Sequence, residues 1–125
     1  SGNWRTTMKI VNKPWGYEKW IGGDGEHYFM KQIMMKAGFK SSLQRHEKKR
    51  ELIYILSGQG IITVDDKKYP FKPDCYFQIC PPTVHRIEAV SDLLMMEVST
   101  IELDDVIRLS DDWSRGNGKI ESEHK

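Results

Sequence analysis

The chain has 125 residues, which is enough for one domain with a hydrophobic core and too few for two. Charged residues make up 30% of it, yet 19 Lys and Arg almost balance 18 Asp and Glu, so the net charge is +1. Nucleic acid or an anionic membrane would require a concentrated basic face, and this balance argues against either as the main partner.

Targeting signals are not evident. No stretch approaches the roughly 18 apolar residues of a membrane span, and the N-terminus lacks the charged-then-apolar pattern of a secretory leader. The two cysteines, Cys75 and Cys80, do not make a disulfide framework. We therefore expect a cytoplasmic protein. Residues 1–9 are expected to be an N-terminal extension or a cloning remnant, with Met8 as a native start.

Short apolar runs separated by turn residues fill the middle of the chain. Turn signals include Gly-Gly-Asp-Gly at 22–25, a hairpin sequence at 65–68 and the Pro81-Pro82 pair. The expected strands are residues 27–36, 51–56, 61–64, 69–71, 75–80, 83–90 and 93–100. Many short strands at regular spacing, with no long helical period, predict an all-β sandwich or barrel.

The character of the chain changes after Thr100. Residues 103–109 are expected to form one or two helical turns, with Asp104 and Asp105 near the start. From Ser110 onward the chain is polar and contains several glycines. We expect a β-barrel over residues 10–101 and a short helical or irregular segment over 102–125 that packs on it, with a mobile end.

Four potential metal ligands lie in and after the segment 38–58. Gln44 and His46 are two residues apart, so on an extended strand both side chains point to one face. Glu51 opens the next apolar run and can point back to that face across a turn. His85 begins another strand after Pro81-Pro82. We predict that the four side chains converge inside the barrel, whereas His27 and His124 are interpreted as ordinary polar residues.

The predicted donor set combines one amide oxygen, two imidazoles and one carboxylate. Such a set suits one divalent ion, with zinc expected first and manganese, iron, cobalt or nickel as alternatives. The absence of cysteine ligands argues against a structural zinc site. Four protein ligands leave coordination positions for water or substrate, as Lewis-acid catalysis requires.

The spacing of these residues resembles a known sequence motif. Gly38, Gln44, His46, Glu51 and Gly58 resemble the first cupin motif, with Gln in place of its first His. Residues 81–85 resemble the second motif and retain its His, although Pro82 stands where Gly is usual. The resemblance implies the cupin fold, a double-stranded β-helix or jelly roll.

A narrower resemblance extends over roughly residues 10–115. The segments 14–16, 28–31, 36–38, 42–46, 85–86, 104–109 and 112–115 follow one another as in the type II phosphomannose isomerase domain. That domain is often fused behind a mannose-1-phosphate guanylyltransferase, which is not present here, so a free-standing cupin is expected. The segment 47–50 has less histidine than the family, and its Lys48-Lys49-Arg50 run is interpreted as a solvated turn.

The resemblance implies a metal-dependent isomerase acting on a sugar phosphate of the mannose-6-phosphate/fructose-6-phosphate type. Strand alternation allows Glu97 and Lys31 to face the interior, and these are the candidates for the proton-transferring base. The alternatives are a solvent-facing position for Glu97, and a contact with the substrate phosphate or a surface position for Lys31. Glu97 would require a pKa raised by burial. For the substrate, Arg115 is the first phosphate-binding candidate, followed by Lys40 and Arg86, and Trp15 is a candidate for sugar stacking. Alternation points Arg86 outward if His85 points inward.

Other functions agree with the same residues. The chain could be a non-catalytic metal cupin that binds a sugar or sugar phosphate, or one that assists a nucleotidyltransferase. A cupin oxygenase is a further alternative, although Gln44 weakens it because such sites usually have three histidines. We also expect a homodimer, because a small barrel with exposed strand edges has reason to pair.

Overall fold

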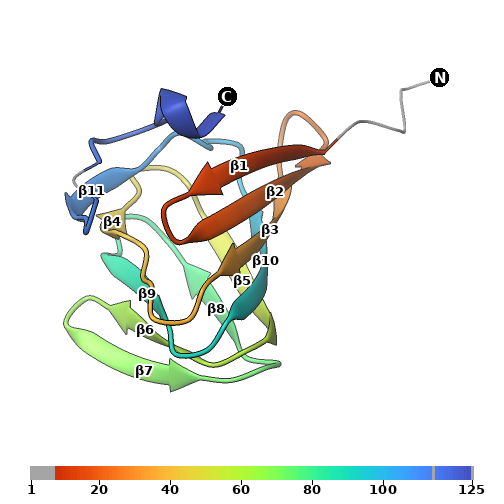
Figure 1. Cartoon of the computed structure of the whole chain (residues 1–125). Coiled ribbons are helices and arrows are strands. Elements are labelled where there is room, and N and C mark those ends of the chain that lie inside the picture. The colour runs from red at the N-terminus through yellow and green to blue at the C-terminus, as the bar shows by residue number, and fades with distance from the viewer. Residues whose placement is uncertain (1–7, 114, 125) are drawn as a thin grey trace.

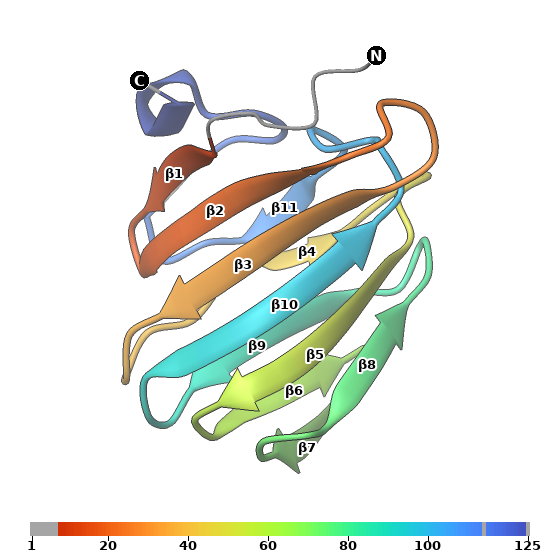
Figure 2. The same ribbon diagram turned by 90° about the vertical axis from the view of Figure 1, so that its right-hand side faces the viewer.

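Two antiparallel sheets packed face to face form the body of the molecule in the computed structural model, which describes residues 8–113 and 115–124. Figures 1 and 2 show the two layers and the C-terminal segment at one end. The six-stranded sheet has the order β1(Lys9–Lys13), β2(Gly16–Gly23), β3(Phe29–Met35), β10(Leu93–Ser99), β5(Glu51–Ser57) and β8(Tyr76–Ile79). The five-stranded sheet has the order β11(Ile107–Ser110), β4(Leu43–Arg45), β9(His85–Ala89), β6(Gly60–Val64) and β7(Lys67–Phe71).

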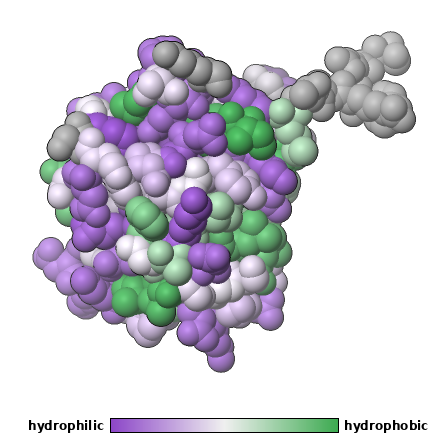
Figure 3. Space-filling view, in the orientation of Figure 1, coloured by the Kyte–Doolittle hydropathy of each residue, from purple (hydrophilic) through white to green (hydrophobic). Residues whose placement is uncertain are grey.

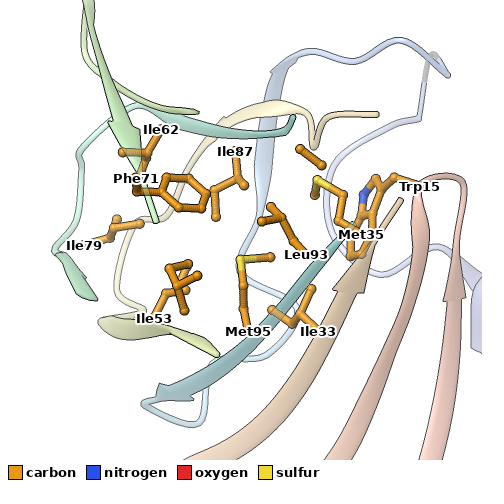
Figure 4. Packing of buried hydrophobic residues seen from close by; sticks show 12 residues of the cluster. Trp15, Ile33, Met35, Ile53, Ile62, Phe71, Ile79, Ile87, Leu93 and Met95 are labelled. Atoms are coloured by element: carbon orange, nitrogen blue, oxygen red, sulfur yellow. The ribbon is translucent and has the colours of Figure 1, made fainter. Parts of the chain in front are cut away.

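Strand alternation explains why the sheets enclose a core. In β5, β9 and β10 every second residue is buried, as expected for antiparallel sheets with one covered face. Figure 4 shows the apolar side chains meeting between the two layers. The buried cluster contains Trp15, Ile33, Met35, Ile53, Ile55, Ile62, Phe71, Ile79, Ile87, Ala89, Leu93 and Met95. This apolar core fills one end of the barrel and leaves the other end to polar side chains.

The strands predicted for residues 27–100 are confirmed, with boundaries that differ by a few residues. The hairpin at 65–68 is confirmed as the β6–β7 turn, where Asp65 has a φ of 53°. The strands β1 and β2 were not predicted, because their inward positions include charged groups and the alternation is not visible. Gly58 is required for space: a Cβ there would lie 2.1 Å from the Asp92 carbonyl oxygen.

The prediction of helical turns at residues 103–109 is wrong. Ile107–Ser110 forms the strand β11, which pairs with β4 and becomes the edge of the sheet. The backbone groups of β4 on that side therefore form hydrogen bonds with β11. Asp105 does not begin a helix either, since its carboxylate accepts hydrogen bonds from the amides of Glu47, Lys48 and Lys49. Long-range pairing therefore overrides the local sequence signal.

The described residues beyond β11 include a short 3-10 helix, Glu121–His124, which lies beside β1 (Figure 1). Lys13 of β1 binds Glu123 at 2.7 Å, and Lys9 contacts His124. Hydrophilic and hydrophobic residues are interspersed on this face of the molecule (Figure 3). Within the described residues, no helix has the length and apolar character needed to cross a bilayer.

Candidate metal centre

The two sheets bring the predicted ligands to the polar end of the barrel. Gln44 of β4 lies directly opposite His85 of β9, so both side chains point to the same face of the five-stranded sheet. Glu51 is the first residue of β5 in the other sheet, and His46 directly follows β4. The site therefore depends on facing layers, and no single strand could supply it.

Three of these residues form a tight buried cluster. His46, Glu51 and His85 are 2%, 7% and 4% exposed. The Nε2 atom of His46 lies 3.2 Å from Glu51 Oε1, and the Nε2 atom of His85 lies 3.3 Å from the same oxygen. The potential ligand atoms of all three lie within 4.8 Å of one another. Two nitrogens and one oxygen thus converge on a single point.

Hydrogen bonds on the far side of each ring fix the histidine tautomers. His46 Nδ1 lies 2.6 Å from the Asp105 carbonyl oxygen, and His85 Nδ1 lies 3.0 Å from the Thr83 carbonyl oxygen. A carbonyl oxygen only accepts, so each Nδ1 carries the proton and donates it. In the neutral rings both Nε2 lone pairs then face the Glu51 carboxylate.

This arrangement of donor atoms fits a divalent cation. Lone pairs on two nitrogens and a carboxylate oxygen repel one another at 3.2–3.3 Å unless a cation lies among them. Those separations are about the edge of a tetrahedron with metal–ligand bonds of about 2.0–2.1 Å. Backbone carbonyls that hold the far nitrogens of ligating histidines are the usual supporting partners of such sites. The residues present could therefore hold a metal ion.

Gln44 is the fourth predicted ligand. Its side chain is half-buried and lines the same cavity as the two histidines and Glu51. Since it stands opposite His85 across the β4–β9 pair, its amide has access to the same end of the barrel. The coordination of a metal by Gln44 stays a prediction.

A cavity of about 100 Å³ adjoins the cluster. Its floor is the apolar core, including Trp15, Ile33 and Met95. The C-terminal segment also lines it, with residues that include Val106, Arg108, Arg115 and Gly118. The candidate ligands, the apolar core and the C-terminal segment therefore share one cavity.

Three buried charged side chains, Lys49, Glu97 and Lys31, and the partly buried Glu18 continue from the cluster toward β2. Lys49 Nζ lies 3.3 Å from Glu51 Oε2 and also 3.3 Å from Glu97 Oε2. Lys31 Nζ lies 4.0 Å from Glu97 Oε2 and 3.4 Å from Glu18 Oε1. Acids and bases alternate in this row, so each buried charge has an opposite neighbour, as burial of charge requires.

Burial and neighbouring charges shift the pKa values of Glu51 and Glu97 in opposite directions. Desolvation, the strongest influence, raises the pKa of Glu97 to about 7, aided by the Glu51 carboxylate and opposed by Lys49. Although burial acts in the opposite direction, the Lys49 ammonium holds the pKa of Glu51 well below its usual range. For Lys49, the Glu51 and Glu97 carboxylates outweigh burial and raise the pKa. Glu51 and Lys49 therefore stay charged at neutral pH, whereas Glu97 can exchange a proton.

The residues predicted to be catalytic do face the interior. Glu97 and Lys31 stand opposite each other on β10 and β3, are 5% and 4% exposed, and line the cavity. Burial of Glu97 raises its pKa in the predicted direction. Their catalytic roles stay predictions.

The predicted substrate-binding residues are more dispersed. Arg115 lines the cavity, but its guanidinium binds Asp111 at 3.0 Å and Glu123 at 3.1 Å. Arg86 donates instead to the Ser41 and Ser110 carbonyls, and Lys40 lies 3.9 Å from Asp112. Neither of these two lines the cavity. Trp15 is 5% exposed and belongs to the core while also touching the cavity floor.

Sequence reasoning missed several polar residues of the site. The interpretation of residues 48–50 as a solvated turn is wrong for Lys49, which is 4% exposed and points inward between two carboxylates. Lys49 is two residues from Glu51, and on an extended chain that spacing places both side chains on one face, which could have predicted its inward position. Glu18 and Trp20 lie on β2, where Trp20 Nε1 donates to Glu18 at 2.9 Å. Their place in the site depends on the pairing of β2 with β3.

Two curated relatives are similar over most of the chain. Mannose-1-phosphate guanylyltransferase RfbM of Salmonella typhimurium is 30% identical over 104 residues, covering 79% of this chain and 22% of that protein. Alginate biosynthesis protein AlgA of Pseudomonas aeruginosa is 29% identical over 111 residues, covering 84% and 23%. The chain spans half or less of the length of the curated relatives that it matches.

Similarity to solved structures agrees with the fold. A protein of Acidithiobacillus ferrooxidans, named provisionally as a sugar phosphate isomerase, superposes with a TM-score of 0.63 at 22% identity, covering 82% of this chain and 72% of that one. The family model described as "Cupin domain" matches residues 30–101, which contain all four predicted ligands. With its two antiparallel sheets and this match over more than half of its length, the chain belongs to the cupin family.

Proposed function

We propose that the protein is a metal-dependent isomerase that interconverts an aldose phosphate and a ketose phosphate of the mannose-6-phosphate/fructose-6-phosphate type. The observation that carries the proposal is the position of Glu97. Glu97 has a pKa raised to about 7 and lines the same cavity as the His46–Glu51–His85 cluster. Lys49 lies between the two, because its ammonium contacts both Glu97 and Glu51. Proton transfer at neutral pH requires such a group.

The chemistry divides between the metal ligands and Glu97. A divalent ion held by His46, Glu51, His85 and Gln44 would supply Lewis acidity to the oxygens on C1 and C2 of the sugar. The Glu97 carboxylate removes the proton from C2 of the open-chain aldose and returns it to C1. The hydroxyl proton moves from O2 to O1 in the same conversion. The product is the ketose, and the carboxylate is regenerated.

The two interior lysines have supporting roles in this proposal. Lys49 stays charged between Glu51 and Glu97, so it stabilises the ionised form of Glu97 and the negative charge that develops on the sugar. Lys31 pairs with Glu97 and Glu18, and its ammonium lies 4.5 Å from the centre of the Trp20 ring. The apolar floor around Trp15 keeps water away from the reacting carbons.

The names of the relatives support a sugar phosphate as the substrate class. RfbM is named as a mannose-1-phosphate guanylyltransferase, and this chain matches less than a quarter of its length. A non-catalytic role beside a nucleotidyltransferase would also agree with that name. The proton-exchanging Glu97 favours the isomerase, because a binding protein has no use for a buried carboxyl group titrating near neutrality.

Solvent exchange tests the proposal directly. The metal-loaded protein is incubated in D₂O with mannose 6-phosphate and, in parallel, with a panel of other aldose and ketose phosphates, and NMR follows deuterium at C1 and C2. Exchange accompanied by isomerisation is expected with at least one pair. Glu97→Gln, which keeps the shape of the side chain, is expected to lower the rate by about 10³-fold while the metal content is unchanged.

A matched control and a contrary result complete that experiment. Glu88→Gln alters a glutamate of β9 that pairs with Lys68 at the surface, and its exchange rate should equal that of the wild type. Binding of sugar phosphates without deuterium incorporation from any of them would leave the protein a non-catalytic binder. An undiminished rate in Glu97→Gln would move the base elsewhere.

The homodimer is part of the same proposal. The outer face of the six-stranded sheet exposes Met30, Leu56, Tyr76 and Val98, in strands that lie side by side in Figure 2. Pairing of two copies would remove this apolar surface from water. Sedimentation equilibrium is expected to give about twice the chain mass of 14.6 kDa, and the monomer mass would contradict it.

A further inference from the structure

One positively charged side chain that lines the cavity, that of Arg108, has no role in the proposed mechanism. Arg108 of β11 lies directly opposite Gln44 of β4, which in turn lies opposite His85 of β9. Residues directly opposite one another on adjacent antiparallel strands point to the same face. Arg108 therefore extends the row of the candidate ligands by one strand, and it lines the cavity.

The hydrogen bonds of Arg108 leave one edge of its guanidinium free. Nη1 donates to the carbonyl oxygens of Gly116 and Gly118. Nε is buried and has no hydrogen-bond partner among the described residues, and Nη2 donates to none of them. Nε and Nη2 form the fork with which arginine binds two oxygens of a phosphate at once. A buried donor left unsatisfied is costly, so a missing acceptor is expected beside it.

The guanidinium of Arg108 also has no ion-pair partner among the described residues, and the carboxylates that act on it, Glu123, Asp111 and Glu18, are bound to other cations. Several other basic side chains that line the cavity have carboxylate partners: Lys13 pairs with Glu123, Arg115 with Asp111 and Glu123, Lys31 with Glu18, and Lys49 with Glu97. No described carboxylate lies within ion-pair distance of Arg108. Burial, and then the nearby Arg115 guanidinium, lower the pKa of Arg108. An anion at the free edge would satisfy both the charge and the buried donor.

We propose that Arg108 is the phosphate-binding residue of the site and fixes the orientation of the substrate by holding its phosphate through the Nε–Nη2 edge. The inference rests on the proposed function for the identity of the anion as a sugar phosphate. The geometry agrees with a substrate whose reacting end lies at the histidines. Arg108 stands two strand spacings, about 10 Å, from His85, so the two ends of a six-carbon phosphate can be held at once.

Binding of an unreactive sugar phosphate tests this assignment. Sorbitol 6-phosphate has no carbonyl group and cannot isomerise, so its calorimetric titration into the metal-loaded protein measures binding alone. Arg108→Met keeps much of the aliphatic packing and is expected to weaken that binding on the order of 100-fold. Sorbitol itself, measured in parallel, is expected to bind wild type and variant equally.

Two further variants keep the test decisive. Arg45→Met is the matched control: Arg45 lies on the same strand pair, opposite Ile107, and points to the outer face. Its affinity for sorbitol 6-phosphate should stay within about twofold of the wild type. If Arg108→Met fails to fold because the Gly116 and Gly118 contacts are lost, Arg108→Lys keeps the charge without the fork. The expected loss for Arg108→Lys is about tenfold.

The outcomes separate this inference from the proposed function. Equal affinities in the wild type and the Arg108 variants, or no binding of sorbitol 6-phosphate to the wild type, would overturn the phosphate assignment even if isomerisation is observed. Arg108-dependent binding by a protein that never exchanges deuterium at C2 would support the phosphate site and reject the isomerase.

Discussion

At the scale of single residues, the site is organised by which atoms already have partners. The Nδ1 atoms of His46 and His85 are occupied by carbonyl groups, so their Nε2 atoms are directed to the Glu51 carboxylate. The spacing of Gln44, His46 and Glu51 made this cluster possible, and the resemblance to the two cupin motifs added His85 and predicted the complete set. The hydrogen bonds that orient the rings come from residues that are distant or unremarkable in the sequence.

We expect the metal content of the protein to depend on the two histidines of this cluster. His46→Ala and His85→Ala each remove one nitrogen donor, and each purified variant is expected to contain less than about a tenth of the wild-type metal by elemental analysis. His27→Ala serves as the control, since the His27 side chain is exposed and contacts Asp24 instead of the cluster. Unchanged metal in both cluster variants would rule out the site.

The charge of Lys49 has a separate effect on stability. Lys49→Met leaves the buried Glu51 and Glu97 carboxylates without their shared cation, so the free energy of unfolding of the metal-free protein is expected to fall by about 3–5 kcal/mol. Adding Glu97→Gln to this variant removes one of the uncompensated charges and should restore part of the loss. Urea denaturation measures both, and additive effects would show that the three groups are not coupled.

At the scale of elements, the C-terminal segment matters because it reaches back into the ligand loop. The Asp105 carboxylate accepts hydrogen bonds from the amides of residues 47–49. The backbone carbonyl oxygen of Asp105 accepts a hydrogen bond from His46 Nδ1. Burial acts to raise the pKa of Asp105, but those amides lower it, so its carboxylate is ionised when it holds the loop. Local sequence favoured a helix start here, and the pairing of β11 with β4 decided otherwise.

Removal of this link should loosen the metal site without removing a ligand. Asp105→Ala is expected to weaken metal binding by about 10–100-fold in a competition titration with a chromogenic chelator. Asp104→Ala changes the exposed neighbour and should have little effect on metal affinity. Equal affinities for the two variants would mean that residues 47–49 are held in place without the carboxylate.

At the scale of the whole molecule, the barrel has an apolar end and a charged end, and the buried charges make its stability depend on pH. Although burial acts in the opposite direction, Lys31, Lys13 and the Trp20 hydrogen bond lower the pKa of Glu18 from its ordinary value of 4.5 to about 2. Ionised Glu18 therefore stabilises the folded state above pH 4.5. That contribution is lost as the pH falls from 4.5 toward 2.

Glu18→Gln should flatten this part of the stability curve. At neutral pH the variant is expected to be less stable than the wild type by about 3 kcal/mol, and the difference should shrink as the pH falls below 4.5. Urea denaturation of both proteins between pH 7 and pH 2.5 measures the difference. A gap that stays constant over this range would show that Glu18 has the same pKa in the folded and unfolded states.

The sequence by itself predicted an all-β barrel and most of its strands from short apolar runs between turns, and the resemblance of its motifs to the cupin family predicted the cupin fold and the cluster of His46, Glu51 and His85. Only the tertiary structure placed Lys49 in the interior, turned residues 107–110 into β11 and put Arg108 in the row of Gln44 and His85. The physical reason is that each of these positions is fixed by partners distant in the chain, and a sequence pattern records only neighbours.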